Sequence, residues 1–320
     1  MKNILVSGAS GIIGYGILRS LKKSEKKIHL IATTIYENSA AEGFCDVFEK
    51  APLTSDSCYI DWLLSIIKKH QIDLIIPGIE ADMYKWDEHS AEIEKSGVKI
   101  VLNNKTLISL CNDKWVFYEE LNKNNSPYKI ETTLVSDFDF LVDKFGLPFL
   151  LKPRFGHGSK GIVRIQNSED FCKHQQDIGV KLMVQPIVGN DNEEYTTSAF
   201  CDGKGSFFAN MTLRRTLSKQ GFTENAEVVN IDGIEDALRN LCDVFKPIGP
   251  TNFQFRMHNR GLKLLEINPR ISSSTSIRTA FGYNEAEMAV DCFLENKIPT
   301  QPLIKQGKSV RYTEDLIFYL

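Results

Sequence analysis

Residues 254–270 read Gln254-Phe-Arg-Met-His-Asn-Arg-Gly-Leu-Lys-Leu-Leu-Glu266-Ile-Asn268-Pro-Arg270, two apolar runs joined by a short polar stretch. The runs at residues 252–257 and 262–267 have the residue types of strands, and the polar residues 258–261 between them predict a hairpin loop. The sequence therefore predicts two paired strands that carry an unusual group of polar side chains.

Three oxygen-bearing side chains and one arginine gather on this predicted hairpin. Glu266 and Asn268 are two residues apart in one strand, so both point to the same face of the sheet, beside Gln254 of the other strand. Oxygen ligands in this number suit Mg²⁺, and the guanidinium of Arg270 suits a phosphoryl or acyl-phosphate group. A half-buried edge hairpin whose polar residues face water would carry the same residues, so the hairpin alone leaves both interpretations open.

A second informative segment lies upstream, where an apolar strand ending at Lys152 enters a loop that contains Gly156, Gly158, Ser159 and Gly161. Glycines allow backbone N–H groups to wrap an anion, and a lysine adds a point charge. The Gly-Lys-Ser/Thr ending of a P-loop is absent from this loop. The segment therefore predicts a β-hairpin flap over phosphates, with an ordinary glycine-rich turn as the alternative.

Taken in order over residues 110–295, these segments resemble the ATP-grasp superfamily. The residues that the resemblance assigns to ATP are Lys114, Lys152, Gly156, Gly158, Ser159, Gly161, Gln185, Pro186, Val188 and Glu194. The two lysines and the flap would hold phosphates, residues 185–188 the adenine, and Glu194 the ribose. Gln185 stands where the superfamily usually has Glu, and its carbonyl can still accept a hydrogen bond.

The resemblance also implies a metal cofactor, two Mg²⁺ ions with Mn²⁺ as an alternative. Glu266 would bridge the ions, and Gln254 and Asn268 would complete their shells. This order of ligands looks most like the carbamoyl-phosphate-synthase members of the superfamily, although Ser273 stands where those synthases carry a further arginine.

Those synthases are several times longer and duplicated, whereas 320 residues hold one ATP-grasp unit. The resemblance therefore implies a stand-alone, ADP-forming carboxylate–amine ligase that works through an acyl phosphate. Its partners would be a small-molecule carboxylate and an amine, and a homodimer is also implied.

Three arginines are the catalytic candidates. Arg270 would stabilise the acyl phosphate, and similar ligases place a second arginine in the stretch that here contains Arg214 and Arg215. A solvated pair of charges on a strand edge is the alternative for Arg214 and Arg215.

The first third of the chain alternates strands and helices, a pattern that predicts a parallel sheet. Gly8, Ser10 and Gly11 precede an apolar helix, and a glycine loop at a helix N-terminus can bind an anion. In similar ATP-grasp enzymes this loop faces the acceptor substrate. The alternative is an NAD(P)-dependent reductase or epimerase of the short-chain type. Against that alternative, the second strand ends in threonines, without the acid that would bind an adenosine ribose, and the chain has no Tyr-x-x-x-Lys pair.

Glu80 and Asp82 follow the predicted strand at residues 73–77, at the edge where open α/β sheets bind ligands. They would hold a substrate amine or, equally, cap the helix that follows.

The predicted fold class is therefore α/β and α+β, a Rossmann-like parallel-sheet domain (a pre-ATP-grasp domain) followed by an ATP-grasp fold of two subdomains. The predicted divisions are residues 1–105, residues 106–185 with the flap, and residues 186–320 with the metal-binding hairpin. Residues 310–320 predict one last apolar strand.

Composition argues against several other classes. The net charge of −3, without a basic stripe interleaved with aromatics, gives no support for nucleic acid as a partner. The apolar runs are far shorter than the roughly 18 residues of a membrane span, and no signal peptide is evident. Seven scattered cysteines predict reduced thiols in the cytoplasm. An ATP-grasp fold that binds ATP without chemistry, as a regulatory module, is a further alternative to the ligase.

Overall fold

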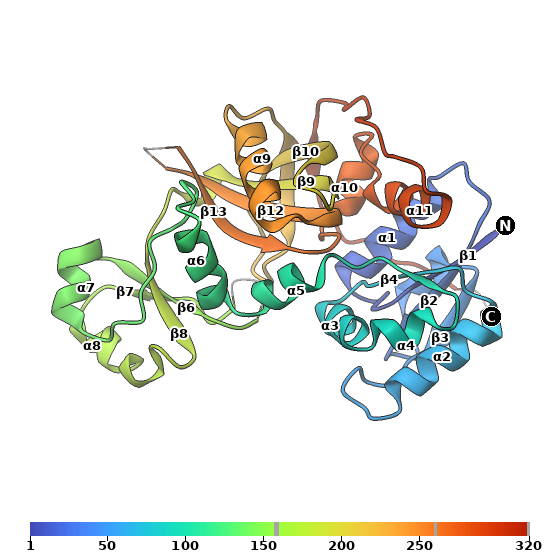
Figure 1. The fold of residues 1–320 in the computed structure, drawn as a ribbon, viewed down its shortest axis with the longest axis horizontal. Coiled ribbons are helices and arrows are strands. Elements are labelled where there is room, and N and C mark those ends of the chain that lie inside the picture. The colour runs from blue at the N-terminus through green and yellow to red at the C-terminus, as the bar shows by residue number, and fades with distance from the viewer. Residues whose placement is uncertain (157–159, 259–260, 319–320) are drawn as a thin grey trace.

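The computed structural model of the protein describes residues 1–156, 160–258 and 261–318. Its strands form three sheets that follow one another along the long axis of the molecule (Figure 1). A five-stranded sheet lies at one end, a three-stranded sheet at the other, and a six-stranded sheet between them. The central sheet carries the predicted metal-binding hairpin.

The first sheet is parallel and has the strand order β3-β2-β1-β4-β5. Its strands are β1 (Lys2–Val6), β2 (Ile28–Thr34), β3 (Val47–Lys50), β4 (Leu74–Ile76) and β5 (Lys99–Ile100). Successive residues of β1 face opposite sides, so Ile4 and Val6 enter one hydrophobic cluster and Leu5 enters another. Sequence analysis missed β3, which is short and only partly buried.

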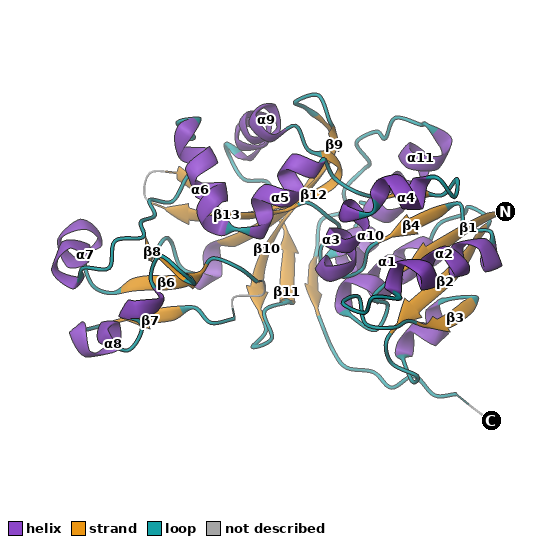
Figure 2. Ribbon diagram, turned by 60° about the horizontal axis from the view of Figure 1, so that its bottom comes forward, coloured by secondary structure: helices purple, strands orange, loops and turns teal. Residues whose placement is uncertain are grey.

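Helices cover both faces of this sheet (Figure 2). On the side of Ile4 lie α1 (Ile12–Lys22) and α11 (Glu285–Glu295). On the side of Leu5 lie α2 (Tyr59–His70), α3 (Glu80–Glu88) and α4 (Ser90–Glu94). The loops after β1 and β4 touch so closely that a Cβ added at Gly78 would lie 2.1 Å from the carbonyl oxygen of Ser7.

The three-stranded sheet is antiparallel and has the order β7-β6-β8. It consists of β6 (Phe149–Pro153), β7 (Val163–Ile165) and β8 (Leu182–Pro186), and it is covered by α7 (Phe138–Phe145) and α8 (Ser168–Cys172). The loop between the paired strands β6 and β7 is the predicted flap. Two helices, α5 (Lys105–Asn112) and α6 (Lys114–Lys123), lead into this sheet from the first one.

The six-stranded sheet has the order β13-β12-β9-β10-β11-β14 and is antiparallel throughout. Its strands are β9 (Glu194–Asp202), β10 (Phe207–Leu217), β11 (Thr223–Val228), β12 (Ile248–His258), β13 (Gly261–Asn268) and β14 (Lys308–Val310). The buried side of α9 (Ile234–Phe245) packs on one face, and α10 (Thr275–Ala280) contributes Ile277 to the cluster on the other. Short 3-10 turns are η1 (Ala40–Phe44), η2 (Gln175–Asp177) and η3 (Asp191–Glu193).

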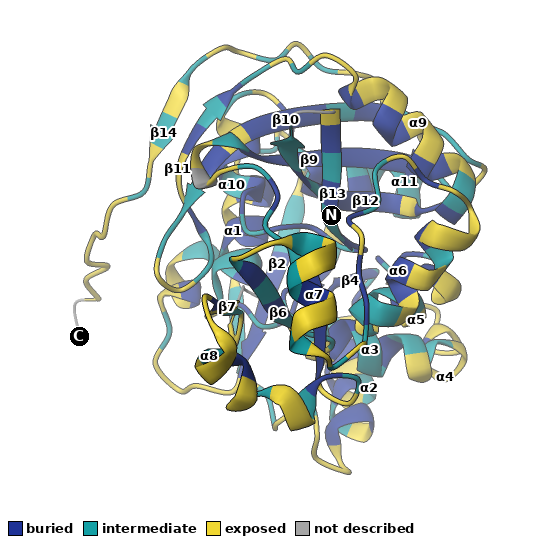
Figure 3. Ribbon diagram, turned by 90° about the vertical axis from the view of Figure 1, so that its left-hand side faces the viewer, coloured by how far each residue is buried: buried dark blue, intermediate teal, exposed yellow. Residues whose placement is uncertain are grey.

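The predicted fold class is confirmed, because a parallel N-terminal sheet is followed by two antiparallel sheets. The prediction of a terminal strand at residues 310–320 is wrong for residues 311–318, and its last two residues, 319 and 320, lie outside the described residues. The last strand, β14, ends at Val310, and residues 311–318 form an irregular segment that is mostly exposed (Figure 3). The division into three segments stays a prediction, and α11 packs on the first sheet although it belongs to the last segment. None of the described helices is long and apolar enough to cross a bilayer.

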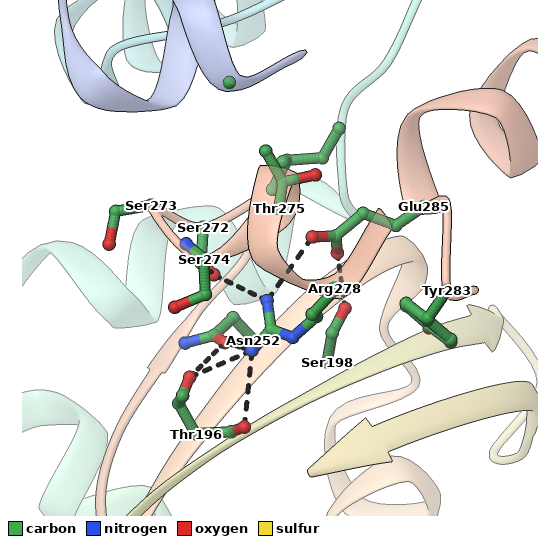
Figure 4. A network of polar contacts seen from close by, with 12 residues as sticks. Thr196, Ser198, Asn252, Ser272, Ser273, Ser274, Thr275, Arg278, Tyr283 and Glu285 are labelled. Carbon is green, nitrogen blue, oxygen red and sulfur yellow. Dashed lines mark hydrogen bonds and ion pairs between the residues drawn. The ribbon is translucent and has the colours of Figure 1, made fainter. Parts of the chain in front are cut away.

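A buried ion pair fixes α10 and α11 on the central sheet (Figure 4). Arg278 and Glu285 are both 0% exposed and lie 3.3 Å apart. The guanidinium of Arg278 also donates to the hydroxyl of Ser272 at 2.7 Å and to the side-chain oxygen of Asn252 at 2.8 Å. This network ties the serine-rich segment after Arg270 to strand β12.

Removal of one charge of this pair should be strongly destabilising. Glu285→Ala leaves the Arg278 guanidinium buried without its carboxylate, and we expect the free energy of unfolding to fall by about 3–5 kcal/mol in urea denaturation. The double variant Arg278→Met with Glu285→Leu removes both charges and should lose less. A loss below about 1 kcal/mol for the single variant would contradict the prediction.

Candidate nucleotide and metal site

Two joined cavities lie where the three-stranded and six-stranded sheets meet. One measures about 240 Å³ and is bordered by α3, α6 and β13, and the other measures about 120 Å³ and extends to the chain after β8. The residues that line both are Lys114, Ile130, Lys152, Gly156, Gln185, Leu265 and Glu266. The joined space therefore brings together predicted site residues from four separate parts of the chain.

The end of β8 and the chain that follows it contribute Gln185, Pro186 and Val188 to the smaller cavity. The side-chain amide of Gln185 donates to the hydroxyl of Thr132 at 2.8 Å. Since its NH₂ group is engaged in this way, its carbonyl oxygen remains as an acceptor. Sequence analysis did not identify Thr132, which lies far from any of the motifs.

Two lysines stand at the other end of the cavities. The ammonium of Lys152 donates to the carbonyl oxygen of Leu265 at 3.2 Å, and burial lowers the pKa of this lysine. The ammonium of Lys114 donates to the carbonyl oxygen of Gly156 at the start of the flap. Gly156 and Gly161 have φ angles of +93° and +76°, a region that favours glycine. Gly158 and Ser159 lie outside the described residues.

A buried carboxylate between two guanidiniums occupies the face of the sheet beside the smaller cavity. One oxygen of Glu194 accepts from Arg215 at 2.9 Å, and the other accepts from Arg256 at 2.9 Å. Only 6% of the Glu194 side chain is exposed. A ribose hydroxyl at this position would therefore share the carboxylate with both arginines. Sequence analysis missed Arg256, although its position two residues after Gln254 places both on one face of β12.

The two neighbouring arginines of β10 face opposite ways. Arg215 also donates to the side-chain oxygen of Gln254 at 2.8 Å, so it joins Glu194 to the hairpin. Arg214 points to the other face, where it pairs with Glu227 and is nearly half exposed. The structure thus brings Arg215 together with the other predicted site residues and leaves Arg214 apart from them.

The hairpin places its three oxygen-bearing side chains as neighbours. Gln254 and Glu266 are direct partners across β12 and β13, and the amide of Asn268 donates to the Glu266 carboxylate at 3.1 Å. These hard oxygen donors fit Mg²⁺. Among the described residues, no group of three or more His, Cys, Asp or Glu side chains could hold a metal. An ion here would therefore depend on one carboxylate, two amide oxygens and the oxygens of a bound phosphate.

Arg270 pairs with an acid on α3, a helix that covers the first sheet. Its guanidinium pairs with Glu80 at the start of α3 and donates to the carbonyl oxygen of Ile271 at 3.1 Å. Glu80 lines the larger cavity together with Glu266. It therefore meets the hairpin directly, through its ion pair with Arg270.

Asp82 lies elsewhere, in a third cavity of about 380 Å³ that also contains Gly8, Ser10 and Gly11. Its carboxylate accepts from the hydroxyls of Thr54 and Tyr59 at 2.6 and 2.7 Å. The structure therefore separates Asp82 from Glu80 and groups it with the glycine loop.

Comparison with known proteins agrees with this geometry. The family described as ATP-grasp in the biosynthetic pathway with Ter operon matches residues 180–316, and the PylC-like N-terminal domain matches residues 5–101. The carbamoyl phosphate synthase large chain of Clostridium perfringens is 21% identical over 337 residues, which cover 90% of this chain and 30% of that protein. The chain thus spans less than a third of this relative.

Two solved structures illustrate the likeness in fold. The N5-carboxyaminoimidazole synthetase of Staphylococcus aureus, complexed with ADP, has a TM-score of 0.72 and 18% identity, over 95% of this chain and 80% of that one. The biotin carboxylase domain dimer of the Hydrogenobacter thermophilus 2-oxoglutarate carboxylase, complexed with MgADP, ADP and bicarbonate, has a TM-score of 0.74 and 14% identity, over 96% and 73%. The chain therefore contains an ATP-grasp domain preceded by a PylC-like N-terminal domain, as its resemblance to the ATP-grasp superfamily predicted.

Proposed function

We propose that the protein is an ADP-forming ligase that joins a small-molecule carboxylate to an amine through an acyl phosphate. The observation that carries this proposal is the convergence of Lys114, Lys152 and Glu266 on the joined cavities, with Arg270 just beyond them. A shared fold does not by itself show a shared activity, so each step of the proposed reaction must be supported by residues of this chain.

In this proposal ATP lies in the joined cavities. The adenine meets the carbonyl of Gln185 and the backbone at Pro186 and Val188, and the ribose meets Glu194. The phosphates extend toward Lys152 and Lys114, under the flap that Gly156 and Gly161 begin and end. Lysine ammonium groups and glycine backbone amides together suit a polyphosphate.

Gln254, Glu266 and Asn268 would hold the metal, two Mg²⁺ or Mn²⁺ ions. When bound, the ions would neutralise the negative charge that develops on the phosphates during the transfer. The hydrogen bond from Arg215 leaves the Gln254 oxygen one lone pair for an ion.

The reaction that these residues fit has two steps. An oxygen of the substrate carboxylate attacks the γ-phosphorus, the bond to the β-phosphate oxygen breaks, and ADP leaves. The amine nitrogen then attacks the acyl carbon, phosphate departs, and the amine proton passes to solvent. Arg270, held by Glu80, would face the mixed anhydride. A closed flap would exclude the water that hydrolyses such an intermediate.

Seven free thiols support a reducing compartment, and we place the activity in the cytoplasm. The end of β2 also argues against a dinucleotide reductase, because the last two residues of this strand are the buried Thr33 and Thr34 and not an acid.

The first test is ADP release from Mg-ATP against pooled carboxylic acids, amino acids and amines. Glu266→Ala removes the only carboxylate of the hairpin ligands, so acceptor-dependent ADP release should fall at least about 100-fold. The fold should survive, as checked by circular dichroism. Near-wild-type ADP release by the variant would refute the metal assignment. ATP binding without ADP release for any pool would favour the regulatory module, and NADPH binding without ATP binding would favour the reductase.

Arg214 and Arg215 provide a matched pair of substitutions. Arg215→Met deprives Glu194 and Gln254 of a shared donor, and we expect ADP release to fall at least about 10-fold, since charge-assisted bonds in the site are lost. Arg214→Met removes an exposed ion pair. It should change the free energy of unfolding by no more than about 0.5 kcal/mol and leave the rate of ADP release nearly unchanged. Equal losses in the two variants would contradict the assignment of Arg215 to the site.

Lys152 should show opposite effects on stability and on binding. Burial lowers the pKa of Lys152, which means that the charged ammonium group destabilises the folded protein when no nucleotide is bound. Lys152→Met should therefore raise the melting temperature without nucleotide and abolish the additional rise that Mg-ADP produces in the wild type. The control is Lys173→Met, an exposed lysine of the three-stranded subdomain. An unchanged shift with Mg-ADP in the Lys152 variant would exclude this lysine from the phosphate site.

A further inference from the structure

The C-terminal residues 308–318, here called the C-terminal strap, connect the central sheet to the first domain. β14 pairs with β11, and the backbone N–H of Arg311 donates to the carbonyl of Glu224 at 2.9 Å. Farther along, Leu316 packs so tightly on Gly43 that a Cβ there would lie 2.5 Å from it. The strap therefore runs from the edge of the six-stranded sheet to η1, and Figure 2 shows the C-terminal end of the chain on the side of the first sheet.

Along this path, the side chain of Arg311 reaches the serine-rich segment. Its guanidinium donates to the backbone carbonyl of Ser273 and lies beside the hydroxyl of Tyr15 on α1. Arg311 is half-buried, and its Nε is buried without a hydrogen-bond partner in the described parts of the chain. The pKa of Arg311 is lowered, mainly by burial and in part by the nearby charge of Arg19.

Arg311 differs from every other buried or half-buried arginine among the described residues. Each of the others pairs with a carboxylate, and these arginines are Arg154, Arg215, Arg256, Arg270 and Arg278. Neither Arg311 nor its neighbour Arg19 has an ion pair within the described chain, and Arg19 instead lies over the ring of Phe44, 5.7 Å from its centroid. Two guanidinium groups that lie near each other without an acid repel, and an anion between them would relieve this repulsion.

The position of this pair relative to Arg270 indicates what the anion is. Ser273 follows Arg270 by three residues, so their Cα atoms are at most about 11 Å apart. Tyr15 and Arg19 belong to α1, which begins directly after the glycine loop, and its Gly16 touches Thr275 of α10. Arg311 therefore contacts the segment that directly follows Arg270, and Arg19 lies on the helix that follows the glycine loop.

We propose that Arg311, with Arg19 and Tyr15, binds a second anionic group of the acid substrate, a carboxylate or a phosphate. The substrate class is thus a small acid with two anionic groups, one that is activated near Arg270 and one that the C-terminal strap holds. This inference rests on the proposed ligase function. It makes the strap part of the substrate site and gives that site a preference for doubly charged acids.

Calorimetry on the full chain tests the proposal, with the nucleotide site filled by Mg²⁺ and a non-hydrolysable ATP analogue. Succinate, glutarate and adipate vary the distance between two carboxylates, 3-phosphopropionate supplies a phosphate as the second group, and butyrate is the matched single anion. We expect at least one dianion to bind the wild type at least 10-fold more tightly than butyrate. The better of the carboxylate and phosphate probes identifies the second group.

Arg311→Gln should reduce the affinity for the dianion to that for butyrate and leave the affinity for the ATP analogue unchanged. Arg311→Gln combined with Ser273→Arg places a guanidinium back beside the same carbonyl and should recover part of the preference. Arg239→Gln, which removes an exposed arginine of α9, is the control and should behave as the wild type.

Two results would overturn the inference, a wild type that binds butyrate and all dianions alike, and an Arg311→Gln variant that keeps the dianion preference. Failure of the proposed function gives a different signature, since Mg-ATP would then release no ADP with any of the acids and pooled amines, whether or not the ATP analogue binds. Dianion binding that depends on Arg311 would in that case still support the anion site itself.

Discussion

The Glu194 carboxylate, enclosed by Arg215 and Arg256, connects three strands at the centre of the molecule. The three residues come from three different strands, β9, β10 and β12. The pairing register of these strands places both arginines opposite Glu194, and the ion pairs in turn stabilise this register. Burial of three charges costs desolvation free energy that only this geometry offsets. Because Arg215 also holds the oxygen of Gln254, the same contact orients the hairpin that would bind metal. Arg215 thereby connects Glu194, the proposed ribose ligand, to Gln254, a proposed metal ligand.

The local part of this arrangement could be predicted from the sequence. Alternation within a strand places Glu266 near Asn268, and glycines around Lys152 indicate a flap. The same rule could not choose between Arg214 and Arg215, since adjacent residues always face opposite sides. The choice depends on the register that pairs Arg215 with Glu194, a contact between strands. For Glu80 and Asp82 a local rule was available, because two residues on a helix point roughly 200° apart and so cannot share one site.

Contacts between distant segments were beyond prediction from one sequence. Glu80 and Arg270 are 190 residues apart, and nothing in either motif indicates the other. The tail was mispredicted for a related reason. Its apolar residues have the composition of a strand, but β14 ends at Val310, after which the tail turns away toward the first domain, where Leu316 meets Gly43. Strand propensity depends on a partner edge, and the sequence does not show where that edge ends.

The segment between Arg270 and Ser273 is held by charges from outside the hairpin that precedes it. Glu80 of the first domain engages one end, and Arg311 of the C-terminal strap engages the other. In the proposed function, the nucleotide contacts come from Lys114 of α6, the two antiparallel sheets and the flap. If both proposals hold, changes in the first domain and the strap would alter the acid that is recognised while the sheets keep the phosphate chemistry. In these proposals, substrate choice would depend on Arg311 of the strap, which lines neither of the joined cavities, and on Glu80, which lines the larger one beside Glu266.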